Sequence, residues 1–477
     1  MTIRCLVLSR MTATAVALSM VAVGALTGCS PQNGATAPSF TTVRTSTQPF
    51  KAEQDQSDSF TTGISPVVTV DLFSGPIIVK PSGEVGVKVS LTKRAGGETQ
   101  AEAEENLKYI DLEVQQDADK VNVTARQNDD DFTGFLEVAT EMEVPPGTVL
   151  DLRNGFGPVT VSSVGDTVTI HASNGPITVE QGVGELNLTS AFGNVSVDGE
   201  HTKVKVKVGN GQVTVVGAKG PVDVGSDYGA IEIRSAAGVV NVTGINGAIK
   251  IAGGPGPMEL TTAFGDIEIS ADHAPVTAKT ANGKITLTGG DGGVNLQTDF
   301  GDIDVQKTAG AVRAHTTNGA VRVVDGKGPF DVSSEFGDIT VDAMGAPITA
   351  RTSNGKIVLR GGKGKIDARS NFGAVDLAAE QATVTAHSTN GSVGFTGTLL
   401  EGEHSFGTAF GDITLSLPAD ARFRLDAQTD FGRVTSGFEI SRSESSTESH
   451  LIGTVGKDAL ASVKVRNSNG NIDVKRK

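Results

Sequence analysis

Aromatic and cysteine residues are scarce in this sequence. Tryptophan is absent, and the 477 residues include two tyrosines and two cysteines, Cys5 and Cys29. Cys5 falls in a segment with the features of a removable export signal, so the mature chain can form no internal disulfide and no cysteine-based zinc site. The absence of tryptophan also argues against a sugar-processing cleft, because such pockets favour aromatic faces.

Positive charge is also in short supply, with 40 basic against 55 acidic residues and a net charge of −15. Removing residues 1–28 would take away Arg4 and Arg10 but no acidic residue, so −15 becomes −17. An acidic chain is a poor partner for nucleic acid, whose affinity for proteins depends on phosphate neutralisation. Beyond Gly28, no segment is apolar enough to span a bilayer.

The N-terminus indicates export. Arg4 and Arg10 precede an uncharged stretch over residues 11–28 that is too short for a membrane span. The stretch ends in Leu26-Thr27-Gly28-Cys29, which resembles the bacterial lipobox. That resemblance implies cleavage before Cys29, acylation of Cys29 and a lipid anchor on the extracytoplasmic face of the cell envelope. An ordinary secretory signal with a chance cysteine is the alternative.

Glycine is abundant, with 60 residues, and it follows a strict repeat. An aromatic residue or Asn followed by Gly recurs at an 18-residue interval, and the two types alternate, so the full sequence repeat is a 36-residue unit. The positions are Phe156, Asn174, Phe192, Asn210, Tyr228, Asn246, Phe264, Asn282, Phe300, Asn318, Phe336, Asn354, Phe372 and Asn390.

Each repeat unit has the pattern of two short strands joined by a tight turn. In the unit around Phe264-Gly265, residues at every second position up to Phe264 are predicted to face inward, and the parity changes after Gly265. The expected inward set is Met258, Leu260, Thr262, Phe264, Ile267 and Ile269. The Asn of the alternate units is expected at the same inward corner position, where its amide must hydrogen-bond the turn backbone because an unpaired buried amide is costly.

The regular interval also bears on how the strands are connected. Asn-Gly between strands, as at Asn282-Gly283, is a hairpin signal, so a series of hairpins is the rival fold. A series of hairpins does not require a constant interval, whereas each coil of a solenoid must match the one below it. The unbroken interval therefore favours a solenoid.

Charges distinguish an 18-residue coil from a 36-residue coil. The position four past the aromatic or Asn carries Glu232, Lys250 and Glu268 in successive units. An 18-residue coil would place these opposite charges on neighbouring rungs, where they attract, whereas a 36-residue coil would stack Glu on Glu. The sequence therefore predicts an all-β, single-chain β-solenoid (β-helix) with 18-residue coils.

Both ends depart from the repeat. Residues 29–60, rich in Ser, Thr, Gln and Pro, are predicted to be a flexible tether. Residues 61–150 carry strands out of phase with the repeat and one short helix, Glu98–Leu107, and are predicted to form an N-terminal β cap. Residues 151–404 form the predicted solenoid, and 405–477 a C-terminal β cap that keeps the motif but loses the spacing.

The turn motifs resemble those of a bacterial β-strand-repeat family. The resemblance rests on the alternating Asn-Gly and Phe-Gly-Asp-Ile turns, on Pro145-Pro146-Gly147, and on the closing Asn469-Gly-Asn-Ile-Asp473, and it covers roughly residues 60–477. Members of this family are described as proposed adhesins, and their domain is of unknown function. The resemblance implies an extracytoplasmic β-solenoid and says little about activity.

Two glycine-rich patterns resemble a phosphate-binding loop and a calcium-binding repeat, but neither has the features that binding requires. Gly253-Gly-Pro-Gly256 and related segments suggest phosphate loops, but none opens a helix after a strand. The same segments resemble a calcium-binding nonapeptide, but its ligand Asp is replaced here, for example by Met258 and Val294. No cofactor and no metal site is therefore expected.

A basic or titratable residue lies three positions before six of the seven Asn from Asn174 to Asn390. We call this row the basic stripe: His171, Lys207, Lys279, His315, Arg351 and His387. An outward row of this kind could contact an anionic envelope polymer. Neutralisation by neighbouring acids such as Asp227, Asp299 and Glu335 is the favoured interpretation of the stripe.

Three functions fit these observations to different degrees. The favoured one is an exported, lipid-anchored, adhesin-like binding module without catalytic activity, whose partners are the membrane and an envelope polymer or surface protein. A structural or scaffold lipoprotein of the envelope is the alternative. A carbohydrate-active enzyme is least favoured, because the acidic residues follow the repeat instead of forming a paired-carboxylate exception to it.

Overall fold

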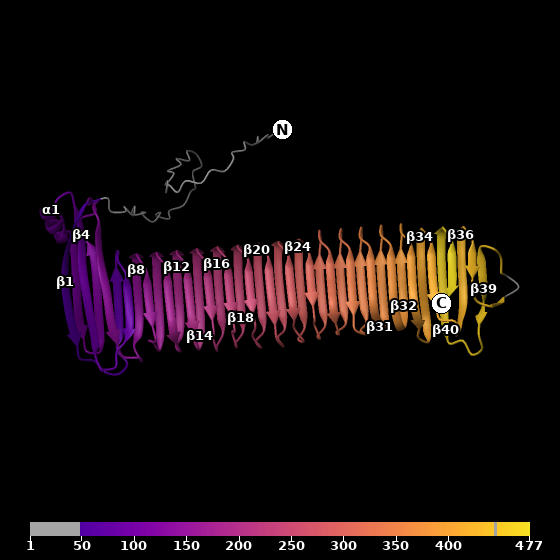
Figure 1. Ribbon diagram of the computed structural model, residues 1–477, viewed down its shortest axis with the longest axis horizontal. Coiled ribbons are helices and arrows are strands. Elements are labelled where there is room, and N and C mark those ends of the chain that lie inside the picture. Colours follow the sequence, from indigo (N-terminus) through magenta and orange to yellow (C-terminus); the bar gives the residue numbers. More distant parts are fainter. Residues whose placement is uncertain (1–47, 443–445) are drawn as a thin grey trace, which may run out of the picture. The chain divides into compact units, whose positions relative to one another are not determined.

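The computed structural model describes residues 48–442 and 446–477. These residues form a β-solenoid in which the strands of successive coils lie side by side (Figure 1). Each coil contributes one strand to a first row and one to a second row. Neighbouring coils pair in parallel at an 18-residue offset, as in Val276↔Val294 and Ile285↔Ile303. The predicted fold class and coil length are thereby confirmed.

The first-row strands share the position before the glycine turn. They are β2 (Val67–Leu72), β8 (Val149–Phe156), β10 (Thr167–Asn174), β12 (Glu185–Phe192), β14 (Lys203–Asn210), β16 (Val222–Tyr228), β18 (Val240–Asn246), β20 (Met258–Phe264), β22 (Val276–Asn282), β24 (Val294–Phe300), β26 (Val312–Thr316), β28 (Phe330–Ser334), β30 (Ile348–Thr352), β34 (Gly402–Phe410), β40 (Ala461–Asn469) and β36 (Phe423–Phe431).

The second-row strands follow the turn. They are β3 (Ile77–Pro81), β9 (Val159–Ser162), β11 (Ile177–Gly182), β13 (Val195–Gly199), β15 (Val213–Val216), β17 (Ile231–Arg234), β19 (Ile249–Ala252), β21 (Ile267–Ala271), β23 (Ile285–Gly289), β25 (Ile303–Gln306), β27 (Val321–Gly326), β29 (Ile339–Ala343), β33 (Val393–Leu399), β35 (Ile413–Leu417), β41 (Ile472–Arg476) and β37 (Val434–Ser436). Two longer strands, β31 (Ile357–Ser370) and β32 (Val375–Ser388), run from the second row into the first row of the next coil.

The core is one continuous column of aliphatic side chains between the two rows. In the coil of β20 and β21, Met258, Leu260, Ile267 and Ile269 are buried as expected. Alternation of buried and exposed positions along each strand gives every coil the same inward set, so each coil stacks on the next with matching apolar surfaces.

The turn between the two strands of a coil, here called the corner, requires glycine. Gly265 has a φ of +148°, a conformation that L side chains rarely adopt. Its N–H donates a hydrogen bond of 3.0 Å to the carbonyl of Asn282 in the next coil. A β-carbon at Gly265 would overlap the carbonyl oxygen of Gly247 in the preceding coil. The same overlap recurs at the corners from Gly157 to Gly391.

From Gly247 to Gly391, the carbonyl of the corner glycine accepts a hydrogen bond from a buried hydroxyl. Thr298 Oγ1 donates to the Gly283 oxygen at 3.0 Å, and Ser334 Oγ donates to the Gly319 oxygen at 2.8 Å. Because an unpaired buried hydroxyl is costly, this bond explains a polar residue inside an apolar column. The hydroxyls that bond a corner glycine belong to Thr262, Thr280, Thr298, Thr316, Ser334, Thr352, Ser370, Ser388, Thr408 and Thr429.

The inward orientation predicted for Phe264 is wrong. Thr262 is buried, but the ring of Phe264 is 53% exposed. The strand's alternation ends at the hydroxyl residue, whose side chain fills the inside of the corner, and the chain then bends so that the aromatic residue points to solvent. Neither the aromatic nor the Asn of each unit belongs to the core.

Opposite charges meet across the coils as the 18-residue register predicts. Lys250 and Glu268 are ladder partners and their side chains approach to 3.1 Å. The Asp of the Phe-Gly-Asp motif has a second role that the sequence did not reveal: Asp266 Oδ1 accepts a hydrogen bond of 2.8 Å from the backbone N–H of Lys284 in the next coil. Asp302 and Asp338 accept the equivalent bond from the coil that follows each of them.

The N-terminal end is closed by strands that double back. The coil β2–β3 lies between β8–β9 and an outer pair, β6 (Lys120–Gln127) and β7 (Leu136–Val144). Antiparallel strands β5 (Ile110–Asp117), β4 (Val87–Gly97) and β1 (Phe50–Phe60) then cover β6 and β7. Helix α1 (Gln100–Asn106) starts at the N-cap Thr99, inside the predicted helix, and a 3-10 turn, Leu107–Tyr109, follows it.

The C-terminal end repeats this arrangement. The last coil in sequence, β40–β41, does not sit at the end but pairs in parallel with β34–β35 on one side and with β36–β37 on the other. The antiparallel strands β38 (Ser441–Arg442) and β39 (His450–Val455) close the outer side of β36 (Figure 1). Strands that cover an exposed edge protect it from pairing with other chains.

Two of the expected segment boundaries differ from the structure. The predicted tether extends to residue 60, but β1 pairs with β4 along its whole length, which residues 50–60 would not do as a flexible linker. Strands β2 and β3, predicted to be out of phase, form a regular coil of the solenoid. The signal segment and Cys29 lie outside the described residues. Within those residues, no helix has the length and apolarity needed to cross a bilayer.

Two histidines are buried in the solenoid and held neutral. His404 is 2% exposed; its Nδ1 accepts from the Val384 N–H at 3.2 Å and its Nε2 donates to the Leu400 oxygen at 2.9 Å. Burial lowers the pKa of His404, as it does that of His201. Protonation would remove the acceptor that holds the Val384 N–H, so His404 couples stability to pH.

We predict that Gly265→Ala destabilises the protein by about 1–3 kcal/mol, because the added methyl must displace the Gly247 carbonyl of the preceding coil. Gly225→Ala is the matched control, since a β-carbon at Gly225 meets no atom within 4 Å. The denaturant midpoint followed by circular dichroism measures both. Equal midpoints for the two variants would contradict the proposed glycine requirement.

The second prediction concerns acid. Because the folded pKa of His404 is lowered, the unfolded state binds more protons below a pH of about 6.5, and stability falls as the pH is lowered through that window. The variant His404→Gln keeps a donor and an acceptor. Its melting temperature should therefore fall less than that of the parent between pH 7 and pH 5. His171→Gln, at an exposed position, should follow the parent. Parallel pH profiles for all three proteins would exclude His404 as a source of the effect.

Candidate binding surface

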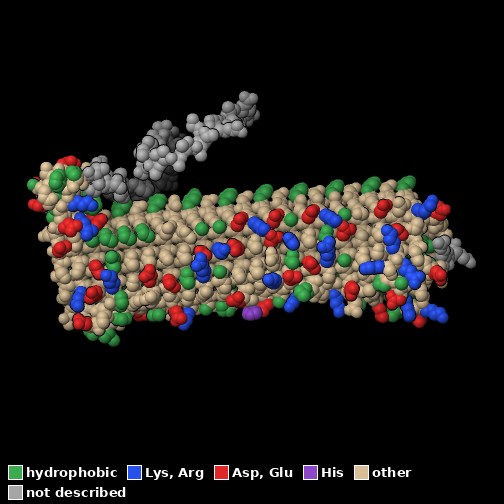
Figure 2. All heavy atoms as spheres, in the orientation of Figure 1, with side chains coloured by type: hydrophobic (Ala, Val, Ile, Leu, Met, Phe, Trp, Pro, Cys, Tyr) green, Lys and Arg blue, Asp and Glu red, His purple; other side chains and the backbone are tan. Residues whose placement is uncertain are grey.

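An aromatic row runs along the corner edge of the solenoid. It consists of Phe156, Phe192, Tyr228, Phe264, Phe300, Phe336, Phe372, Phe410 and Phe431. From Phe192 onward every ring is between 48% and 75% exposed. Figure 2 shows hydrophobic side chains spaced evenly along one long edge. Because the rings occupy alternate coils, neighbouring rings are separated by roughly 9.6 Å, twice the rung spacing.

An asparagine row fills the intervening coils. It consists of Asn174, Asn210, Asn246, Asn282, Asn318, Asn354, Asn390 and Asn469. None of these residues is buried, and within the described residues their side-chain amides make no hydrogen bond to the protein. The prediction that these amides bond the turn backbone is therefore wrong, and each leaves a donor and an acceptor open to solvent.

The alternation continues in space where the sequence spacing breaks down. Asn390 pairs with Phe410, Phe410 pairs with Asn469, and Asn469 pairs with Phe431. Asn469 comes from the last strands of the chain, which insert between two earlier coils. Ring and amide thus alternate through a cap whose chain order is different, so the pattern is a property of the surface and not only of the repeated sequence.

The surroundings of the aromatic row are acidic. An acidic residue directly precedes four of the rings, and the Phe-Gly-Asp carboxylates lie two positions after four rings. These residues are Asp227, Asp299, Glu335 and Asp430 before the rings, and Asp266, Asp302, Asp338 and Asp412 after them. Lys284 and Lys356 occupy the equivalent position two past Asn, and Arg433 follows Phe431, so the acids at this edge outnumber the basic residues. A surface with an excess of negative charge repels anionic polymers.

The basic stripe lies on the first row, where its six members occupy outward positions on β10, β14, β22, β26, β30 and β32. The neutralising acids differ from those expected. Arg351 approaches Asp331 at 3.7 Å and Asp367 at 3.3 Å, whereas Asp227, Asp299 and Glu335 form no ion pair with the stripe in the described part of the chain. Among the same residues, its other five members have no carboxylate partner.

Two of the three histidines of the basic stripe, His315 and His387, hydrogen-bond to serines on the next coil. His315 Nδ1 lies 2.9 Å from Ser333 Oγ, and His387 Nε2 lies 3.1 Å from Ser405 Oγ. Burial, and then the nearby positive charge of Arg369, lower the pKa of His387. His387 is therefore neutral at neutral pH.

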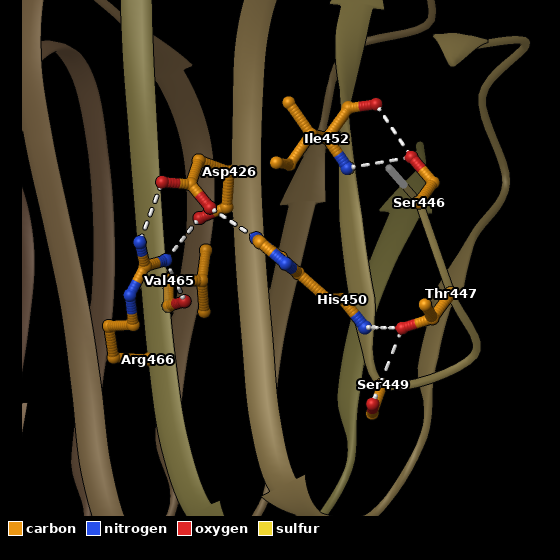
Figure 3. A network of polar contacts seen from close by, with 8 residues as sticks. All are labelled: Asp426, Ser446, Thr447, Ser449, His450, Ile452, Val465 and Arg466. Atoms are coloured by element: carbon orange, nitrogen blue, oxygen red, sulfur yellow. Dashed lines mark hydrogen bonds and ion pairs between the residues drawn. The ribbon is translucent and has the colours of Figure 1, made fainter. Parts of the chain in front are cut away.

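A polar network at the C-terminal end joins three strands (Figure 3). Asp426 on β36 accepts from Arg466 Nη2 on β40 at 2.6 Å and lies 3.0 Å from His450 Nε2 on β39. The bond from Arg466 is the main reason that the pKa of Asp426 is lowered. Thr447 Oγ1 accepts from the backbone N–H of His450 and not from its ring, so the network lacks the hydroxyl nucleophile of a catalytic triad.

A hollow of about 550 Å³ lies over the middle of β31 and β32, where these long strands pass from one row to the other, and its lining is largely glycine and alanine. Its charged lining residues are Lys363, Glu380 and Lys477. With one carboxylate it cannot provide the paired acids of most glycosidases. In the part of the chain that the structure describes, no group of His, Cys, Asp and Glu is arranged to hold a metal ion.

Comparison with known proteins gives a family and no function. No curated protein matches the chain. A proposed cell adhesion protein from Clostridium sporogenes ATCC 15579, of known crystal structure, aligns over 89% of this chain and 100% of its own at 8% identity, but its TM-score of 0.16 supports no inference. The family model Toastrack DUF4097 matches residues 78–342 and 332–475, which together span most of the solenoid. The chain belongs to the Toastrack DUF4097 family.

Proposed function

We propose that the chain is an adhesin-like binding protein of the bacterial cell surface, without catalytic activity. The observation that supports this most directly is the aromatic row, whose exposed rings recur on alternate coils along the solenoid. A surface that repeats along a line suits a partner that also repeats, such as a polymer of the envelope, because many weak contacts then add up.

The attachment to the cell is part of this proposal. A lipid on Cys29, implied by the sequence Leu26-Thr27-Gly28-Cys29, would hold the protein on the extracytoplasmic face of a membrane. Residues 30–47 would link the lipid to β1, which starts at Phe50.

The basic stripe is the proposed contact for an anionic envelope polymer. Lys207 and Lys279 are exposed and have no carboxylate partner within the described residues. Their neighbours in the ladder are neutral: Lys207 pairs with Thr189 and Gly225, and Lys279 with Thr261 and Gln297. An unpaired ammonium group between neutral residues keeps its attraction for phosphate or carboxylate groups.

We predict that replacing Lys207, Lys279 and Arg351 together by Ser weakens binding of residues 30–477 to anionic envelope polymers on an array by about tenfold or more, and reduces the salt dependence. The matched control replaces Lys250, Lys284 and Lys356 by Ser, which removes the same charge from second-row turns and strands where each lysine is paired with an acid. Equal losses in both triple variants would show that net charge, not the stripe, governs binding.

Binding should be measured at low and at physiological salt. The fragment 30–477 contains the whole compact unit of residues 44–477, so it is expected to fold without the lipid. Failure of the parent protein to bind any polymer would contradict the adhesin-like proposal and leave the scaffold role, for which the next search would be among envelope proteins.

A further inference from the structure

The aromatic and asparagine rows together form a regular surface to which no role is yet assigned. We propose that this edge binds a linear, uncharged polysaccharide laid along the solenoid, with sugar rings stacked on the aromatic side chains and hydroxyl or acetamido groups bonded to the asparagine amides. The inference deepens the proposed binding function, on which it rests, and names a ligand class and a face different from the basic stripe.

The backbone does not explain why these residues alternate. Asn282 and Phe264 occupy equivalent corner positions and are ladder partners, each followed by a glycine that makes the same contacts. Either residue type therefore satisfies the turn, and the core needs neither, since the buried hydroxyl of the residue two positions earlier fills the corner. The alternation must serve the outer surface.

The rings are isolated from one another. The ring pairs in the described residues are Tyr109–Phe132, Phe395–Phe406 and Phe423–Phe438, and none involves the aromatic row. A solvent-exposed flat ring provides an apolar face without a hydrogen-bonding demand of its own. The natural replacement of Phe by Tyr228 in this row keeps a flat six-membered ring.

The spacing and the amides indicate a sugar chain. In an extended glycan whose alternate sugars turn over, every second sugar presents the same face, and two sugars cover a length close to the roughly 9.6 Å between rings. The intervening sugar then lies over an asparagine, whose amide offers one donor group and one acceptor with no partner in the described protein. Hydroxyl groups need both.

Charge selects between this ligand and two other occupants. The acids Asp299 and Glu335 directly precede rings, so an anionic polymer would be repelled at this edge. A second copy of the chain packed edge to edge would bring the same acids together, which is also unfavourable. An uncharged glycan experiences neither penalty.

The test measures binding of cellohexaose and chitohexaose, with polygalacturonate as the anionic comparison, to residues 30–477 by isothermal titration calorimetry. Replacing Phe264, Phe300 and Phe336 by Leu should weaken binding of the neutral glycan by about tenfold or more, because Leu is apolar but not flat. Replacing the same residues by Tyr should leave affinity within about twofold. Since these rings are exposed, melting temperatures should be unchanged.

Two further variants separate the interpretations. Replacing Asn282 and Asn318 by Ala should also weaken glycan binding, whereas the Lys207, Lys279 and Arg351 variant should not. Longer oligomers of the same sugar should bind more tightly, since each added pair of sugars reaches another ring.

Three outcomes would overturn the inference. Equal affinity of the Leu and Tyr variants would exclude ring stacking. A change in sedimentation of the Leu variant without any glycan binding by the parent would identify the edge as a self-association surface. Binding of anionic polymers but of no neutral glycan would refute this ligand class while leaving the adhesin-like proposal intact.

Discussion

The close approach of successive coils at the corner glycine governs the rest of this molecule. The glycine N–H reaches forward to the carbonyl of the next coil, and its Cα faces the carbonyl of the preceding one with no room for a side chain. Stacking at this distance fixes the parallel register, and the register in turn fixes which residues meet across coils. The hydroxyl row and the Asp266 type of carboxylate both act on this same contact, one from inside and one from outside.

This constraint explains why most of the repeated residues have structural roles and do not form a catalytic site. Each residue type in the repeat has a structural partner one coil away: aliphatic on aliphatic in the core, hydroxyl on glycine carbonyl, and lysine on glutamate. The exceptions are the exposed rings and amides at the corner and the unpaired lysines of the basic stripe. Functional residues are often those that the fold itself does not require. In this protein, the residues without a partner in the neighbouring coil are the exposed rings, amides and lysines that recur on the surface.

The fold could be predicted from the sequence because stacked coils impose two patterns on it: a constant interval between motifs, and opposite charges at equivalent positions of successive coils. Fourteen evenly spaced motifs and the order Glu232, Lys250, Glu268 were sufficient to define the coil. The direction of Phe264 was not predictable by alternation, because strand parity ends where Thr262 fills the corner. Because Phe264 was expected to face the core, the exposed aromatic row was not predicted from the sequence. The ends were also beyond prediction, since the placement of Asn469 between Phe410 and Phe431 depends on pairing between segments far apart in the chain.

The insertion of the last strands between two earlier coils has a consequence for how such proteins change length in evolution. Because both ends are closed by strands that double back, a coil is most simply added by duplication inside the solenoid. An 18-residue duplication would place ring beside ring, or amide beside amide, somewhere before Asn469. Only a 36-residue duplication keeps the two surfaces in phase with the cap, so relatives of this chain should differ in length by whole pairs of coils.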